Sequence, residues 1–126
     1  MKRQGLSLME LMIALVIVAI VAGMAFPRYQ KMVARSKQAE AKTILKAIYM
    51  GQDLYKTSNQ TYADNLEALD VQIPGDVKYA YSIVVGDNGT TFQARALANI
   101  DSDPIVDEWV INQDNRLENK VNDVIE

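Results

Sequence analysis

The most unusual chemical group in this sequence is a single carboxylate inside a long apolar stretch. Residues 6–26 are almost wholly apolar, yet Glu10 lies near the start of the stretch. A charged carboxylate without a partner costs on the order of a few kcal/mol in lipid. No other side chain within the stretch carries an opposite charge, so the partner of Glu10 is expected to come from outside it.

A second group of carboxylates surrounds Pro104. Asp101, Asp103, Asp107 and Glu108 lie within a few residues of one another on an expected loop, and carboxylate oxygens are ligands that calcium prefers. The segment lacks the glycine and the terminal glutamate spacing of an EF-hand. A calcium site and a solvated acidic turn both remain open for this loop, and no other cofactor is expected.

The residue types present argue against catalysis. The sequence contains no cysteine and no histidine, so a Ser-His or Cys-His nucleophile pair is impossible and the commonest zinc ligands are missing. No convincing cluster of carboxylate, lysine, tyrosine or serine side chains replaces them, and we expect a protein that is not an enzyme. The globular part is acidic overall, so nucleic acid is not an expected partner.

The formal net charge is -3, and the charges are unevenly distributed. Basic residues dominate residues 28–46, whereas acidic residues dominate residues 101–126. Such segregation either helps complementary surfaces of identical subunits to meet or simply reflects solvated faces.

The apolar stretch has the length of a membrane span. As a helix, residues 6–26 would extend about 32 Å, close to the roughly 30 Å of a hydrocarbon core. A signal peptide, a plain membrane anchor and an assembly helix are the three interpretations. Lys2 and Arg3 suit a signal peptide, but its apolar part is shorter. Neither a signal peptide nor a plain anchor explains Glu10, although in a plain anchor Glu10 could be an interfacial residue within about one turn of the membrane edge.

The local motif favours the third interpretation. Residues 5–12, GLSLMELM, resemble the cleavage and methylation site of type IV prepilins, with Leu6 and Ser7 where most members have Phe and Thr. The resemblance implies that a prepilin peptidase cuts between Gly5 and Leu6 and that the new amino group of Leu6 is methylated. It also implies that Glu10 pairs with the Leu6 amine of a neighbouring subunit.

The resemblance covers residues 5 to about 62, close to half of the chain. Residues 25–29, AFPRY, look like the pilin segment in which the apolar helix meets a proline, and Pro27 is expected to kink or loosen the helix. Residues 35–43 are similar to pilins of deltaproteobacterial gliding and metal-reducing bacteria.

The expected fold class is α+β, a pilin fold in which one long N-terminal helix is half transmembrane and half packed on an antiparallel sheet of three or four strands. The expected divisions are a leader (1–5), a transmembrane or filament-core helix (6–27) and a globular pilin domain (28–126). Within the last, we expect a helix (28–56), a loop (57–77) and the sheet (78–121).

Finer patterns predict parts of this domain. We expect Asp64 to cap a short helix ending at Leu69, residues 86–89 to form a hairpin turn, and residues 121–126 to fray. The helix face expected to pack on the sheet comprises Met32, Val33, Ser36, Glu40, Ala41, Ile44, Leu45, Ile48, Leu54 and Tyr55.

The resemblance implies a structural subunit of a type IV pilus, acting in adhesion, twitching motility or DNA uptake. Expected partners are further copies of the chain, the prepilin peptidase, inner-membrane assembly machinery, minor pilins and, before assembly, the membrane. The precursor would cross the inner membrane once with a cytoplasmic N-terminus, and the assembled form would be an extracellular pilus. The alternatives are a major pseudopilin of a type II secretion system, in a periplasmic pseudopilus, and a signal-anchored periplasmic module that does not polymerise.

Overall fold

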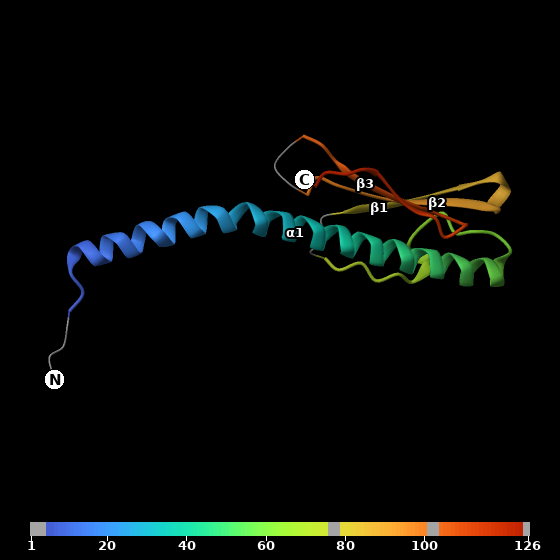
Figure 1. The fold of residues 1–126 in the computed structure, drawn as a ribbon. Helices are drawn as coiled ribbons and strands as arrows, with labels where there is room; N and C mark the ends of the chain where they lie inside the picture. The colour runs from blue at the N-terminus through green and yellow to red at the C-terminus, as the bar shows by residue number, and fades with distance from the viewer. Residues whose placement is uncertain (1–4, 76–78, 101–103, 125–126) are drawn as a thin grey trace. The chain divides into compact units, whose positions relative to one another are not determined.

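One long helix followed by a four-stranded sheet makes up the protein (Figure 1). The computed structural model describes residues 5–75, 79–100 and 104–124. The chain divides into two compact units, Met1–Val33 and Ala34–Glu126. The elements are α1 (Leu8–Asn59), the short 3-10 turns η1 (Glu67–Leu69) and η2 (Asp87–Gly89), and the strands β1 (Ala80–Gly86), β2 (Thr91–Ala98), β3 (Asp107–Asn112) and β4 (Leu117–Val121).

The sheet is an antiparallel meander in the order β1-β2-β3-β4. Ala94 in the middle of β2 lies opposite Ile83 of β1 on one side and Ile111 of β3 on the other. Each strand pairs with the next one along the chain. The predicted α+β class and the antiparallel sheet are therefore confirmed.

The core lies between this sheet and the second part of α1 (Figure 1). In β2 the inward positions Phe92, Ala94, Ala96 and Ala98 are buried, and they alternate with more exposed residues. Three of these four side chains are alanine, so helix and sheet can approach closely. Ala41, Leu45 and Ile48 of α1 are completely buried there, as the helical spacing predicts.

The buried face of α1 differs from the predicted one at several positions. Met32 and Leu54 are 69% and 72% exposed, and Ser36 and Glu40 are exposed as well. In their place the glutamines Gln38 and Gln52 are buried. A pattern based on apolar residues passes over these glutamines, whose amide groups become satisfied only by partners distant in sequence.

Gln52 holds the loop that follows the helix. Its Oε1 accepts a hydrogen bond from the backbone N–H of Ala63 at 2.8 Å, and its Nε2 donates to the carbonyl of the same residue at 2.7 Å. One buried side chain thus satisfies both backbone groups of Ala63. Tyr62 in the same loop also contacts the core, since its ring meets the Phe92 ring edge-on with centroids 4.8 Å apart.

The tip of the β1–β2 hairpin also contacts this loop. Gly89 has φ +86°, and a Cβ atom there would lie 1.9 Å from Oγ1 of Thr61. Its carbonyl accepts a hydrogen bond from the N–H of Tyr62 at 3.1 Å. The predicted hairpin turn is confirmed, and this close approach gives a second reason for glycine beyond the turn itself.

Two local predictions are wrong. The N–H of Ala68, in the short turn η1, donates to the side chain of Asn65 at 2.8 Å, so Asn65 supplies the contact expected of Asp64. The end of the chain does not fray throughout, because Asp123 and Val124 are buried. The backbone N–H of Asp123 donates to a buried carboxyl group of β3, which fixes this segment against the sheet.

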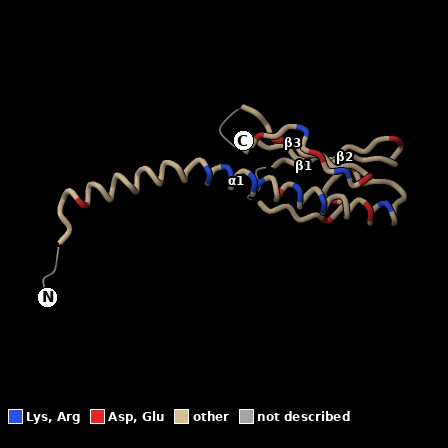
Figure 2. Tube along the Cα trace, in the orientation of Figure 1, with Lys and Arg blue, Asp and Glu red and all other residues tan. Residues whose placement is uncertain are grey.

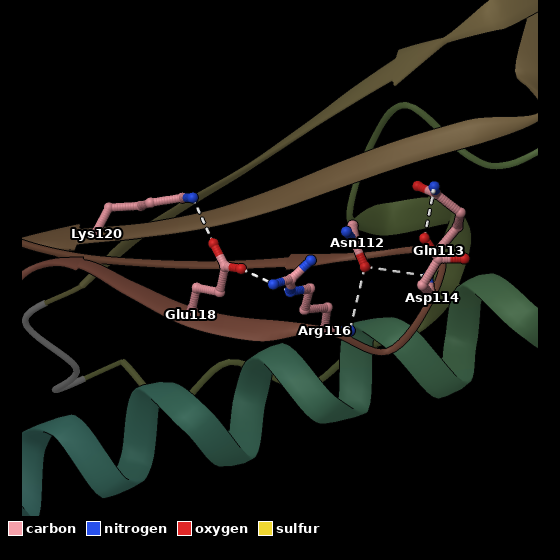
Figure 3. Close-up of polar contacts among 6 residues, drawn as sticks. All are labelled: Asn112, Gln113, Asp114, Arg116, Glu118 and Lys120. Carbon is pink, nitrogen blue, oxygen red and sulfur yellow. Dashed lines mark hydrogen bonds and ion pairs between the residues drawn. The ribbon is translucent and has the colours of Figure 1, made fainter.

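The turn between β3 and β4 is stabilised by side chains near the strand ends (Figure 3). Oδ1 of Asn112 accepts hydrogen bonds from the N–H groups of Asp114 and Arg116, both at 3.1 Å. On β4, Glu118 lies between Arg116, at 2.7 Å, and Lys120. The hydrogen bond from Lys120 and the two positive charges hold the pKa of Glu118 below its usual value.

Candidate functional site

The peptide bond expected to be cut lies outside regular structure. Gly5, Leu6 and Ser7 precede the helix, which begins at Leu8. Leu6 is 82% exposed, and no heavy atom would lie within 4 Å of a Cβ placed on Gly5. Nothing among the described residues therefore covers the bond between Gly5 and Leu6.

The first turn of α1 is closed by a reciprocal pair of hydrogen bonds between Ser7 and Glu10. The N–H of Ser7 donates to Oε2 of Glu10 at 2.8 Å, and the N–H of Glu10 donates to Oγ of Ser7 at 3.2 Å. This arrangement is a capping box. The side chain of each residue accepts a hydrogen bond from the backbone N–H of the other, and neither N–H has a partner within the helix. The positive end of the helix dipole also favours a carboxylate at this position.

Glu10 therefore has a partner within its own chain, contrary to the sequence-based expectation. The Ser-x-x-Glu spacing of residues 7–10 would have revealed it, had it been tested as a helix start. Only one carboxylate oxygen is engaged, because Oε1 makes no hydrogen bond within the described part of the chain. That oxygen remains available to a donor from another molecule.

The apolar part of α1 has no cover in the unit to which it belongs. Its large side chains are between about half and three-quarters exposed, among them Leu11 (47%), Val18 (63%) and Leu8 (75%). Apart from Glu10 this part carries no charge, as the uniform tan of Figure 2 illustrates. By length and composition the helix can cross a membrane. An exposed apolar surface of this extent marks a contact with lipid or with other subunits.

A shallow groove crosses this apolar surface near its start. Its lining residues are Met9, Met12, Ile13, Val16 and Ile17. Methionine adapts its shape readily to different contacts, which suits a surface that must contact both lipid tails and protein.

Pro27 lies inside α1, and the helix is not interrupted there. Proline has no N–H, so the carbonyl of Gly23, four residues earlier, lacks its usual helical donor. The weakened turn is consistent with the predicted kink or loosening, which stays a prediction.

Only two of the four carboxylates near Pro104 can be placed, so the calcium hypothesis stays a prediction. Asp101 and Asp103 lie outside the described residues. Asp107 is completely buried, whereas its neighbour Glu108 points to the other face of the sheet and pairs with Arg95 at 3.0 Å. Within the described ranges no group of three carboxylates is placed to hold a metal ion.

Asp107 has a different role, at the centre of a buried polar cluster. Its two oxygens accept five hydrogen bonds at 2.5–3.3 Å, from Gln38 Nε2, Tyr79 Oη, Trp109 Nε1, Asn119 Nδ2 and the N–H of Asp123. The donors come from α1, from the residue that precedes β1, from β3 and β4 and from the C-terminal segment. Burial and the bond to Asp107 raise the pKa of Tyr79 well above its usual value, so its hydroxyl stays a donor. This cluster stabilises the fold, and Asp107 at its centre is completely buried.

Comparison with known proteins points to one family. Residues 38–110 match a family model described as type IV pilin-like G and H, and residues 1–26 match the prokaryotic N-terminal methylation motif. The type IV major pilin protein PilA of Myxococcus xanthus is 37% identical over 82 residues, which are 65% of this chain and 37% of that protein. Fimbrial protein EcpC of Eikenella corrodens is 32% identical over 88 residues, 70% of this chain and 58% of that protein.

The matched region spans between about one third and three fifths of the length of these relatives. The methylation motif includes the capped start of α1, and the pilin model covers most of the helix–sheet unit. The first match thus concerns the accessible N-terminal segment and the second concerns the fold. Together they establish that this chain belongs to the type IV pilin family.

Proposed function

We propose that the chain is a structural subunit of a type IV pilus, assembled through its N-terminal helix. The observation that carries the proposal is an exposed apolar helix, residues 8–26, with one ionisable side chain in its first turn. A span that only held the protein in the membrane would need no carboxylate there. A helix that also packs against copies of itself could use one to fix its register.

Processing would prepare the helix for this packing. A prepilin peptidase would remove residues 1–5 by cutting after Gly5, and the amine of Leu6 would then be methylated. The leader would lie in the cytoplasm and the globular domain on the far side of the inner membrane. Inner-membrane assembly machinery and minor pilins would act on this processed form.

The capping box suggests how Glu10 acts before and during assembly. In the unassembled chain Oε2 accepts from the N–H of Ser7, which compensates part of the cost of a carboxylate in lipid. Oε1 would then accept from the Leu6 ammonium of a neighbouring subunit. Each of the two charges would thereby be neutralised, and removal of either one would leave the other uncompensated.

Mass spectrometry of the mature protein tests the processing. We expect an N-terminus at Leu6 that carries one added methyl group. An N-terminus at Phe26 would instead indicate ordinary secretion and would exclude assembly through this helix.

Substitution of Glu10 tests the assembly. Glu10→Ala should reduce the yield of sheared filaments by more than about tenfold, because it leaves an amine uncompensated in an apolar environment. Membrane insertion should be unchanged. Ser7→Ala is the matched control, since it removes the hydroxyl cap, worth about 1 kcal/mol, and keeps the carboxylate. Its filament yield should stay within about twofold of the unsubstituted protein.

Filaments from Glu10→Ala at normal yield would exclude the pairing. Equal losses in both variants would show that Glu10 acts only through the helix cap. If deletion of the gene abolished enzyme secretion while surface fibres remained, the protein would instead be a pseudopilin.

A further inference from the structure

A second groove lies at the opposite end of the apolar stretch and is chemically different from the first. Its lining residues are Val21, Met24, Ala25, Arg28, Tyr29 and Met32. Most of these positions are three or four residues apart, so they share one face of α1. The groove is therefore apolar along its first part and has a cation and a phenol toward its other end.

The cations at this end lack an ion-pair partner in the part of the chain that the structure describes. Arg28 and Lys31 take part in no ion pair among the described residues. The sequence contains no acidic residue from position 11 to position 39, so along α1 no carboxylate lies within two helical turns of either cation. Tyr29 and Phe26 beside them are 65% and 62% exposed. This end of the stretch thus presents positive charge together with uncovered aromatic rings.

The position of the groove along the helix indicates what it meets in a bilayer. Residues 6–26 match the thickness of the hydrocarbon core, so residues 26–31 fall at the level of the lipid headgroups. Aromatic and basic side chains are typical of that level. Val21 and Ala25 lie deeper, among the acyl chains. This placement holds whichever end of the helix faces the cytoplasm.

We propose that this end of α1 binds an anionic phospholipid while the subunit is in the membrane. The phosphate would accept hydrogen bonds from Arg28, Lys31 and the hydroxyl of Tyr29, and one acyl chain would lie along Val21 and Ala25. A basic cluster next to a span attracts anionic headgroups over zwitterionic ones. This inference goes beyond the proposed function, since it concerns the subunit before any filament forms.

The shape of the groove favours a lipid over the acidic surface of a second copy. The second unit exposes acidic side chains, for example Asp64, Glu67 and Asp70. A carboxylate could meet Arg28, but an acidic loop would leave the apolar part of the groove unfilled. A phospholipid joins an apolar chain to an anionic group. The groove likewise has apolar residues, Val21 and Ala25, at one end and Arg28 with Tyr29 at the other.

Lipid selectivity of the full-length chain tests the proposal. The chain is reconstituted in phosphatidylcholine vesicles, and electron spin resonance measures how strongly it immobilises chain-labelled phosphatidylglycerol relative to chain-labelled phosphatidylcholine. We expect a preference for phosphatidylglycerol of at least about fivefold at low salt, decreasing in 1 M NaCl. The double variant R28Q/K31Q should fall to within about 1.5-fold of parity.

The matched control R116Q/K120Q removes two positive charges from β4 and the turn before it, on the other unit, and should keep the full preference. Circular dichroism verifies that all three proteins are folded. No preference in the unsubstituted chain would overturn the proposal, and a second copy would then be the better candidate partner. Equal losses in both double variants would also overturn it, since net charge and not this groove would then attract the lipid.

Discussion

The two units of this protein differ in whether their polar and apolar side chains find partners within the chain. In the second unit, the buried polar side chains Gln38, Gln52 and Asp107 find their hydrogen-bond partners within the chain. In the first unit, the apolar side chains of α1 have no cover, and the one carboxylate uses a single oxygen. The second unit is complete as a folded structure, whereas the first is complete only with lipid or with other subunits.

This difference explains how one chain can serve in two environments. The globular unit gains its stability from its own core, so it does not depend on whether the subunit is in a membrane or in a filament. The apolar helix contributes little to that core and keeps its surface for exchangeable partners. The strongest tests of the comparison therefore separate the two units or remove buried hydrogen-bonding side chains from the second unit.

Separation of the units should have the largest effect. A fragment of residues 28–126 contains the whole second unit and only the last six residues of the first. It should be soluble and monomeric and should unfold in one cooperative transition, whereas the full chain should require detergent or lipid. Size-exclusion chromatography and urea unfolding measure this. An aggregated or unfolded fragment would show that the apolar segment belongs to the core and would contradict the division.

Removal of the central acceptor should cost the second unit most of its stability. Asp107→Ala removes an acceptor shared by five donors. Gln38 and Asn119 keep a second acceptor, whereas Tyr79 loses its buried bond, and we expect a loss of about 3–5 kcal/mol in the free energy of unfolding. Glu108→Ala, the adjacent residue on the other face, breaks a partly exposed ion pair and should cost less than about 1 kcal/mol. Urea titration of the 28–126 fragment gives both values. Similar losses would mean that the buried cluster is not central to the fold.

The regular elements of this unit could be predicted from sequence because their signals are local. The alternation in β2, around Phe92 and Ala94, and the turn residues 86–89 predict a hairpin, and the structure has one. The three- to four-residue spacing of Ala41, Leu45 and Ile48 likewise predicts a packed helix, and these residues are buried.

The polar contacts could not be predicted in the same way, because their partners are far apart in sequence. Gln38 and Asp107 are 69 residues apart, and Tyr79 and Asp107 are 28 apart. Only the fold brings such groups together, so glutamine at a helix position was not recognisable as a core residue. The Ser7–Glu10 cap is the exception, since its partners are three residues apart and the pattern is readable.

Tyr79 and Tyr81 offer a finer test of how much a buried hydrogen bond contributes to the stability of the second unit. Tyr79 donates to Asp107 at 2.5 Å, so Tyr79→Phe should cost about 1.5–3 kcal/mol, as expected for a bond to an acidic group. The hydroxyl of Tyr81 is buried and makes no hydrogen bond within the described residues. Burial and the nearby charge of Glu40 raise the pKa of Tyr81 to about 12.

Tyr81→Phe should therefore leave stability unchanged or raise it by up to about 1 kcal/mol, because it removes an unsatisfied polar group. Thermal and urea unfolding of both variants give the comparison. A substantial loss for Tyr81→Phe would mean that its hydroxyl has a partner, and the second unit would then be even more fully satisfied than the structure indicates.

The smallest expected effect concerns the exposed charges of β4, which lie outside this buried network. Glu118 has a lowered pKa because Lys120 donates to it and Arg116 adds a second positive charge. A lowered folded-state pKa means that the stabilisation is present above the usual value of 4.5 and is lost as the pH falls below it. Glu118→Gln should therefore lower the urea midpoint slightly at pH 7, and this difference should disappear in acid.

Glu67→Gln removes the same charge from an exposed residue that has no ion pair among the described residues, and it should leave the midpoint at pH 7 unchanged. The Glu118 difference should also shrink in 1 M NaCl, because salt screens exposed charges. A difference that persisted in acid and in high salt could not be electrostatic. It would mean that the Glu118 side chain stabilises the second unit by packing over the outer face of the sheet. The internal contacts of this unit would then include a surface whose charges are here assigned to solvent.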